Sequence, residues 1–237
     1  ADLVGFTALF SQTVASIAMA RRLKTRNPDI LTVLGGAPCD AEMGLELAEH
    51  IPELDAVFSG PALESFPQFI GYILSGDRAA CDGINGVFTR TNHNRWPGSG
   101  HAKEIGILGD PSDINAVIPL DYDSFLDDLA QAFPDGSQRP ALLFETSRGC
   151  WWAQKKACTF CGLNGLHMQH QNMTPENAIA HIESLYRYFP RCQIFMGVDT
   201  ALPKGFTEDV LPQLTPPEGM NFFYELRPDV TREDIQV

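Results

Sequence analysis

The sequence of 237 residues is short of basic side chains and contains no long hydrophobic run. Its 17 Lys and Arg stand against 30 Asp and Glu, which gives a formal net charge of -13. Because a phosphate backbone or an anionic lipid surface would repel such a chain, we expect no nucleic-acid partner and no membrane partner. Residues 1–10 also lack the basic start and the apolar core of a signal peptide, so we expect a cytoplasmic location.

Strand-like and helix-like segments alternate in the first third of the chain. Short apolar segments at 3–9, 30–34 and 55–58 are each followed by a segment with helical spacing of its apolar residues. Strands that alternate with helices form a parallel sheet with helices on both faces. Residues 1–78 are therefore predicted to form a doubly wound α/β domain of the Rossmann or flavodoxin-like class, whose ligands bind beyond the carboxyl ends of the strands.

The alternation stops at residues 79–139, which are rich in Gly, Asn, Asp and Pro. We interpret this segment as a linker with a small hairpin near 83–91. Alternation resumes at 140–237, where three βα units are expected: strands at 141–145, 193–198 and 221–226, and helices at 175–188 and 206–214. Because the sequence begins in a strand pattern and ends at a helix-start signal, we expect a piece of a longer protein.

Three of the six cysteines lie within twelve residues, directly after the predicted strand at 141–145. Cys150, Cys158 and Cys161 could hold three irons of a 4Fe-4S cluster and leave the fourth iron open, whereas a fully ligated electron carrier needs four cysteines. The competing interpretation is zinc, because Cys158 and Cys161 have ordinary zinc spacing and His167 could join the three thiolates. Spacing alone does not separate an enzyme from a noncatalytic, zinc-stabilised binding module.

The surrounding sequence resembles one enzyme family. The segments SRGCWW, KK and CTFCGLNG, with the later FYELRPDVTRED, are similar to the cobalamin-binding radical S-adenosylmethionine (radical SAM) enzymes that mature ribosomally synthesised peptides (RiPPs). The resemblance implies a cobalamin-binding α/β domain followed by a partial (βα) radical SAM barrel, both truncated. It implies a 4Fe-4S cluster on Cys150, Cys158 and Cys161, with S-adenosylmethionine and cobalamin as the other cofactors.

The resemblance also implies a reaction and its partners. Some members of the family are C-methyltransferases, so the expected activity is C-methylation of a precursor peptide at an unactivated carbon. The expected electron donor is a reductase, a flavodoxin or a ferredoxin. The alternative within the same family is a radical modification of the peptide without methyl transfer.

Five residues are implied as S-adenosylmethionine contacts. Phe160 precedes the last cysteine, where the family's aromatic residue shields the cluster and packs on adenine. Gly197 and Asp199 follow the second barrel strand, and Asp199 could accept hydrogen bonds from ribose hydroxyls or simply cap a turn. Glu225 and Arg227 close the third strand, where their opposite charges could bind the methionine moiety or pair with each other.

Two glycine-containing loops of the first domain, LGGAP at 34–38 and SGPALE at 59–64, resemble cobalamin-binding loops. Alone, such glycines are typical of turns in any doubly wound domain. The polar residues after the first strand could contact cobalamin or cap a helix. No Asp-x-His-x-x-Gly motif occurs, so the lower face of cobalamin is expected to lack a protein ligand on cobalt. The cobalamin residues implied are Ser11, Gln12, Thr13, Gly35, Gly36, Ser59, Gly60 and Glu64.

Overall fold

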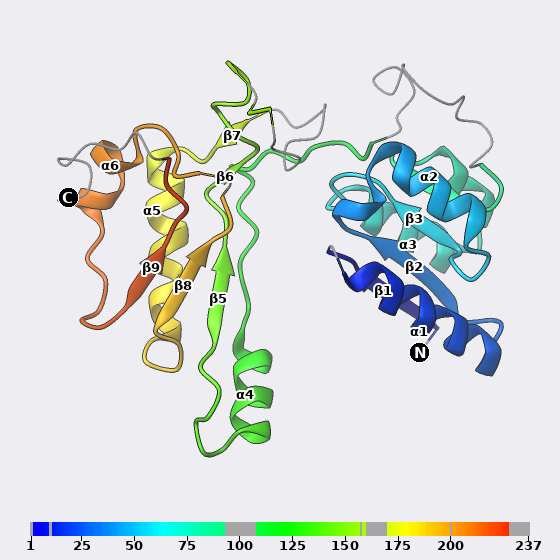
Figure 1. Ribbon diagram of the computed structural model, residues 1–237, viewed down its shortest axis with the longest axis horizontal. Helices are drawn as coiled ribbons and strands as arrows, with labels where there is room; N and C mark the ends of the chain where they lie inside the picture. The colour runs from blue at the N-terminus through cyan, green and yellow to red at the C-terminus, as the bar shows by residue number, and fades with distance from the viewer. Residues whose placement is uncertain are drawn as a thin grey trace. The chain divides into compact units, whose positions relative to one another are not determined.

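The computed structural model describes residues 2–9, 11–92, 108–156, 158–159, 170–199 and 201–227. The chain forms two compact units, Ala1–Ser112 (unit 1) and Asp113–Val237 (unit 2) (Figure 1). Each unit has its own main sheet, with three parallel strands, and its own hydrophobic core.

Unit 1 is built on a four-stranded sheet with the order β1-β2-β3-β4. Its strands are β1 (Leu3–Thr7), β2 (Leu31–Gly35), β3 (Ala56–Phe58) and β4 (Val87–Thr89). The first three are parallel, and β4 is antiparallel to β3. The helices that follow the parallel strands are α1 (Gln12–Arg26), α2 (Ala41–His50) and α3 (Ser65–Ser75), with short 3-10 turns η1 (Ala37–Cys39) and η2 (Arg78–Gly83).

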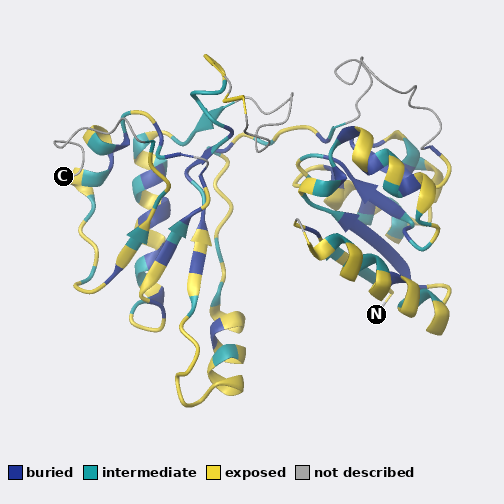
Figure 2. Cartoon of the chain, in the orientation of Figure 1, coloured by how far each residue is buried: buried dark blue, intermediate teal, exposed yellow. Residues whose placement is uncertain are grey.

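The two faces of this sheet are covered by different helices, as the alternation of strands and helices predicts. Successive side chains of a strand point to opposite faces. Leu34 and Val57 accordingly pack with Ala20 of α1 and Ala48 of α2. Their strand neighbours pack with α3 on the other face, in a cluster that contains Val33, Ala56, Phe58 and Phe69. The central strands β2 and β3 are therefore buried on both sides (Figure 2).

The segment 83–91 contributes one strand and not the small hairpin expected from the sequence. This strand, β4, pairs with β3 and not with a neighbour in the same segment. The fully buried Asn92 then closes the turn after β4, because its amide oxygen accepts from the backbone of Thr89 at 2.7 Å and its amide nitrogen donates to Val87 at 2.9 Å.

Unit 2 contains a second parallel sheet with the order β5-β8-β9. Its strands are β5 (Ala141–Phe144), β8 (Ile194–Gly197) and β9 (Asn221–Phe223). A small antiparallel pair, β6 (Ser147–Arg148) and β7 (Gln171–Asn172), follows β5. The helical segments are α4 (Asp123–Ala132), α5 (Pro175–Ser184), η4 (Leu185–Tyr188), α6 (Phe206–Asp209) and η5 (Leu211–Gln213).

The core of unit 2 lies between this sheet and its helices. Leu142 and Phe195 on the strands pack with Ile182 of α5 and Leu185 of η4. The segment 79–139, expected as a linker, carries β4 of unit 1 and α4 of unit 2, and Leu126 of α4 is part of this core. Within the ranges given above, no helix is long and apolar enough to span a membrane.

Candidate functional site

Three loops start at the same edge of the sheet in unit 2. They carry the cysteines and the residues implied for S-adenosylmethionine. Because β5, β8 and β9 are parallel, their carboxyl ends meet at one edge. Cys150 follows β5, Asp199 follows β8 and Arg227 follows β9. The described candidate residues of unit 2 therefore lie at one edge of this sheet, and their contacts with cofactors stay predictions.

Asp199 is buried, with 3% of its surface exposed, and it binds the residues that follow β5. Its carboxylate accepts from the backbone N–H of Thr146 at 3.0 and 3.2 Å and from the Thr146 hydroxyl at 3.0 Å. It also accepts from the backbone N–H of Ser147. Burial raises the pKa of the Asp199 carboxyl, while the hydrogen bonds from Ser147 and Thr146 act to lower it.

The carboxylate oxygens of Asp199 thus accept hydrogen bonds from Thr146 and Ser147, which lead into the loop that carries the cysteines (the cysteine loop). This arrangement corresponds to the turn-capping interpretation that the sequence left open. The ribose contact of Asp199 stays a prediction.

Tyr224 joins the end of β9 to the same cluster. Its hydroxyl lies 3.2 Å from Oγ1 of Thr146, and its ring packs edge-on against Phe144 at 5.5 Å between centroids. A Cβ atom at Gly197 would come within 2.5 Å of this ring, so the glycine makes room for Tyr224. Burial strongly raises the pKa of Tyr224, which keeps the phenol protonated. The sequence did not single out Thr146 or Tyr224, although Thr146 directly precedes the motif SRGCWW and Tyr224 is the second residue of FYELRPDVTRED.

The base of the cysteine loop is closed by the pairing of β6 with β7. Ser147 lies opposite Asn172, and Arg148 lies opposite Gln171, so this pairing fixes the two ends of the segment that carries the cysteines. Nε of Arg148 donates to the Glu145 carboxylate at 2.9 and 3.1 Å, and this pairing raises the pKa of the guanidinium.

The next residue, Gly149, has φ 71, a left-handed conformation that favours glycine. Nδ1 of His170 lies 3.4 Å from the carbonyl oxygen of Gly149. The backbone therefore turns sharply just before Cys150, and the end of the loop contacts that turn.

Cys150 and Cys158 differ from the buried thiols of the chain in accessibility. Cys150 is a half-buried free thiol and Cys158 an exposed one. Phe160, Cys161 and His167 lie outside the described residues. The three remaining cysteines are buried: Cys39, Cys81 and Cys192. Burial and then the charge of Asp40 raise the pKa of Cys39 to about 12, which makes that thiol a poor ligand.

Accessible thiols on one loop are the donor chemistry that an iron-sulfur cluster or zinc requires. Among the described residues, no group of three or more His, Cys, Asp and Glu is placed to bind a metal. These residues include Cys150 and Cys158 but not Cys161. The free, accessible thiols of Cys150 and Cys158 suit either kind of metal site, and the three-cysteine cluster stays a prediction.

Arg227 lies against the two tryptophans that follow Cys150. Its guanidinium carbon is 3.8 Å from the ring centroid of Trp152 and 5.0 Å from that of Trp151. Glu225 is exposed, and its carbonyl oxygen accepts from the backbone of Leu202 at 2.9 Å. The end of β9 is therefore connected to the cysteine loop through Arg227. Contacts of Glu225 and Arg227 with S-adenosylmethionine stay predictions.

In unit 1, the two loops implied for cobalamin are joined to each other. The backbone N–H of Gly60 donates to the Asp40 carboxylate at 2.9 Å, and that of Ala41 donates to the buried Ser59 hydroxyl at 2.8 Å. Gly36 has φ 107, and a Cβ there would collide with the carbonyl oxygen of Ala8. The close approach at Gly36 is therefore to the protein's own backbone, and its cobalamin contact stays a prediction.

The other residues implied for cobalamin lie at the same edge of this sheet. Oε1 of Gln12 accepts from the backbone of Leu9 at 2.9 Å, so Gln12 supports the turn after β1. Ser11 precedes α1 without capping it through its side chain, and Glu64 is exposed before α3. Leu9 and Leu63, on the loops after β1 and β3, are 50% and 42% exposed. The remaining residues of the set are Thr13 in the first turn of α1 and Gly35 at the end of β2.

Comparison with known proteins gives a structural match. No protein-family model and no curated protein matches the sequence. A solved structure of the apo form of OxsB, a cobalamin-dependent S-adenosylmethionine radical enzyme, aligns over 98% of this chain with a TM-score of 0.66 and 17% sequence identity. The chain spans 32% of the OxsB chain. This mixed α/β chain has the fold of part of that enzyme.

We expect Gly36→Ala to destabilise unit 1 by about 2 kcal/mol, because the new Cβ meets a backbone carbonyl and the left-handed φ strains alanine. Gly71→Ala is the matched control: Gly71 lies within α3 with open space around it, so alanine should raise stability by about 0.5 to 1 kcal/mol. Urea unfolding of both variants measures the difference. Equal effects of the two substitutions would refute the close approach at Gly36.

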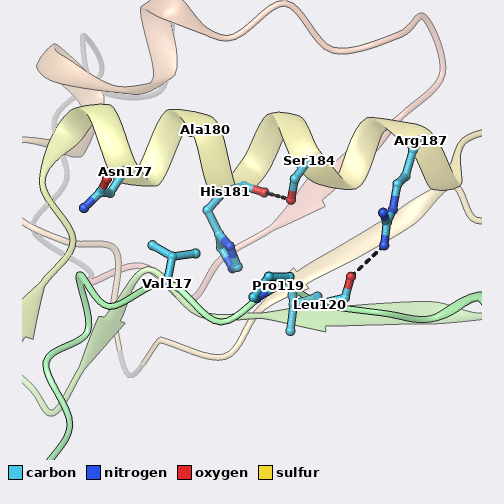
Figure 3. A pocket seen from close by; sticks show the side chains of 8 residues that line it. All are labelled: Val117, Pro119, Leu120, Asn177, Ala180, His181, Ser184 and Arg187. Atoms are coloured by element: carbon cyan, nitrogen blue, oxygen red, sulfur yellow. Dashed lines mark hydrogen bonds between the residues drawn. The ribbon is translucent and has the colours of Figure 1, made fainter.

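A groove of about 280 Å³ lies between α5 and the segment 117–120 (Figure 3). His181 points from α5 toward Val117 and Pro119, and it is 5% exposed. Among the described residues, its Nε2 atom has no hydrogen-bond partner. Burial lowers the pKa of His181, although the charges of Glu145 and Asp199 act to raise it.

This lowered pKa makes the stability of unit 2 sensitive to acid. The unfolded chain takes up a proton near the ordinary pKa of 6.5, whereas folded His181 stays neutral to a lower pH. The free energy of unfolding therefore falls as the pH drops below the unfolded pKa. We expect melting temperatures measured at about pH 7.5 and about pH 5.5 to differ less in His181→Leu than in the wild type. The exposed His50, replaced by Gln, is the control and should keep the wild-type difference. An unchanged pH dependence in His181→Leu would contradict this account.

Proposed function

We propose that this chain is part of a radical SAM enzyme that uses a 4Fe-4S cluster and cobalamin to C-methylate a ribosomally synthesised peptide. The observation that carries the proposal is the position of the cysteine loop. Accessible Cys150 and Cys158 lie on the loop that follows the first strand of a parallel βα sheet. The fold of this chain is that of part of a cobalamin-dependent radical enzyme.

Cys150, Cys158 and Cys161 would hold the cluster. When bound, such a cluster supplies an electron to S-adenosylmethionine, whose cleavage yields a radical able to remove hydrogen from an unactivated carbon. The chain's own contribution is position. Asp199 fixes the start of the loop, and the β6–β7 pairing closes it. Phe160, Gly197, Asp199, Glu225 and Arg227 are the proposed surroundings of S-adenosylmethionine.

Unit 1 would bind cobalamin at the carboxyl edge of its sheet, through the loops that carry Ser11, Gln12, Thr13, Gly35, Gly36, Ser59, Gly60 and Glu64. Bound cobalamin would supply the methyl group. The half-exposed Leu9 and Leu63 offer apolar contacts on two of these loops, which suits a large macrocycle with apolar faces.

The proposal includes the partners and the location of the enzyme. A precursor peptide is the proposed substrate, and a reductase, flavodoxin or ferredoxin the electron donor. A cytoplasmic location is proposed because iron-sulfur clusters and free thiols persist in a reducing compartment.

The test uses the full-length protein, reconstituted without oxygen and incubated with S-adenosylmethionine, cobalamin, a chemical reductant and candidate precursor peptides. The proposal predicts 5'-deoxyadenosine together with a methylated peptide in mass spectrometry. Formation of 5'-deoxyadenosine with an altered but unmethylated peptide would favour the radical modification without methyl transfer. Tightly bound zinc, with no product and no dependence on S-adenosylmethionine, would refute an enzymatic role.

A further inference from the structure

We propose that Arg227 is a positioning residue that holds the cysteine loop through Trp151 and Trp152. The inference rests on the proposed function only for the identity of the group that the loop binds. The contacts themselves belong to the described part of unit 2 and join the end of β9 to the residues directly after Cys150.

The contact is a cation on two aromatic rings. The rings of Trp151 and Trp152 meet edge to face, with centroids 6.1 Å apart and an interplanar angle of 89°. The guanidinium carbon of Arg227 lies 3.8 Å from one centroid and 5.0 Å from the other. A cation within about 6 Å of an indole centroid is attracted by the ring quadrupole. A planar guanidinium can also stack on an indole, which a lysine ammonium cannot do.

A second contact supports the same side of the loop. The indole N–H of Trp151 donates to the carbonyl oxygen of Leu202 at 3.4 Å. The backbone N–H of Leu202 in turn donates to the carbonyl oxygen of Glu225 at 2.9 Å. The segments after β8 and β9 therefore both contact the tryptophan pair. These contacts act on Trp151 and Trp152. Asp199 acts earlier in the chain, where it binds Thr146 and Ser147.

The consequence for the cysteines follows from the covalent chain. Cys150 is bonded to Trp151, so a displacement of the tryptophan pair displaces the Cys150 thiol. Release of Arg227 should therefore expose Cys150 more often and disturb the spacing of the thiols. Lys155 also lies over Trp151, at 5.7 Å, but it belongs to the same loop and cannot anchor the loop to the sheet.

The test begins with the metal-free full-length protein and measures the alkylation rate of Cys150, resolved from the other cysteines by mass spectrometry. We expect Arg227→Ala to raise this rate about fivefold, and Arg227→Lys to raise it less. The matched control is Arg187→Ala, which removes a guanidinium 4.7 Å from the ring of Tyr188, in the same unit. It should leave the Cys150 rate unchanged. If Arg227→Ala does not fold, Trp152→Leu removes the nearer ring and should give the same increase.

The same variants are then reconstituted with iron and sulfide. A loop-positioning role predicts less iron in Arg227→Ala, partial recovery in Arg227→Lys, and a change in the electron paramagnetic resonance spectrum of the cluster that remains. Unchanged Cys150 alkylation in Arg227→Ala and in Trp152→Leu, with wild-type iron content, would overturn the positioning role and leave the proposed function intact. Faster alkylation in a protein that binds only zinc would support the positioning role and overturn the proposed function.

Discussion

Replacement of Cys150, Cys158 or Cys161 by alanine is expected to leave a folded protein that retains almost no iron. Each thiolate would supply one of three ligands, and the loss of one ligand leaves a second iron without a protein bond. The fold should survive because Cys150 is only half-buried and Cys158 is exposed, so neither side chain fills the core. Iron and sulfide analysis, visible absorption and circular dichroism of each variant measure the effect.

Cys192→Ala is the matched control for these substitutions. Its thiol is buried beside β8, where it donates to the carbonyl oxygen of Pro140 at 3.3 Å. The variant should lose some stability and keep its iron. Wild-type iron content in any of the three loop variants would show that the missing thiolate is not a ligand. Unfolding of all three would instead indicate a structural zinc site, because removal of a structural metal unfolds small metal-bound modules.

Asp199→Ala is expected to lower the free energy of unfolding by about 3 kcal/mol. The substitution leaves the backbone N–H groups of Thr146 and Ser147 and the hydroxyl of Thr146 without their buried acceptor. An unsatisfied buried donor costs about 1 to 3 kcal/mol, and a small shift of the backbone would relieve part of the total. The same shift would move the start of the cysteine loop, so reconstituted Asp199→Ala should also hold less iron. Urea unfolding and iron analysis test the two effects separately.

Two further variants separate the role of Asp199 from a general effect of charge. Asp199→Asn keeps one acceptor oxygen but turns an NH2 group toward donors, so its loss of stability should approach that of alanine. Asp128→Asn removes an exposed carboxylate on α4 and should change stability by less than about 0.5 kcal/mol. If Asp199→Ala has the stability of the wild type, the Asp199 carboxylate does not stabilise the segment that follows β5.

Local periodicity was enough to predict the parallel strands of both units and the helices that follow them. The segments 3–9 and 55–58 contain β1 and β3, and the segment 30–34 covers all of β2 except Gly35. The predicted strands of unit 2 contain β5, β8 and β9. The helix predicted at 175–188 is α5 followed by the 3-10 turn η4. The helix predicted at 206–214 is shorter: α6 ends at Asp209, and a 3-10 turn that contains Pro212 follows.

Contacts between distant segments could not be predicted in this way. The pairing of β4 with β3 depends on a partner some thirty residues away, and the short β6–β7 pair has too few residues for a periodic signal. The irregular composition of 79–139 also concealed α4, whose packing becomes evident only when Leu126 is seen against the core of unit 2.

The candidate site shows the same limit. The sequence predicted that Asp199 and Arg227 follow strands. It could not show that Asp199 binds Thr146 or that Arg227 lies against Trp152. Each partner is far away in sequence and is brought near only by the order of the strands. The ligand contact of Gly197 stays a prediction, and the sequence could not show that this glycine makes room for the ring of Tyr224.

The most direct test of the central claim is electron paramagnetic resonance of the full-length protein, reconstituted without oxygen and reduced, recorded with and without S-adenosylmethionine. Iron, zinc and cobalt are quantified in the same sample. The account predicts a 4Fe-4S signal that shifts when S-adenosylmethionine is added. Stoichiometric zinc without such a signal would contradict it.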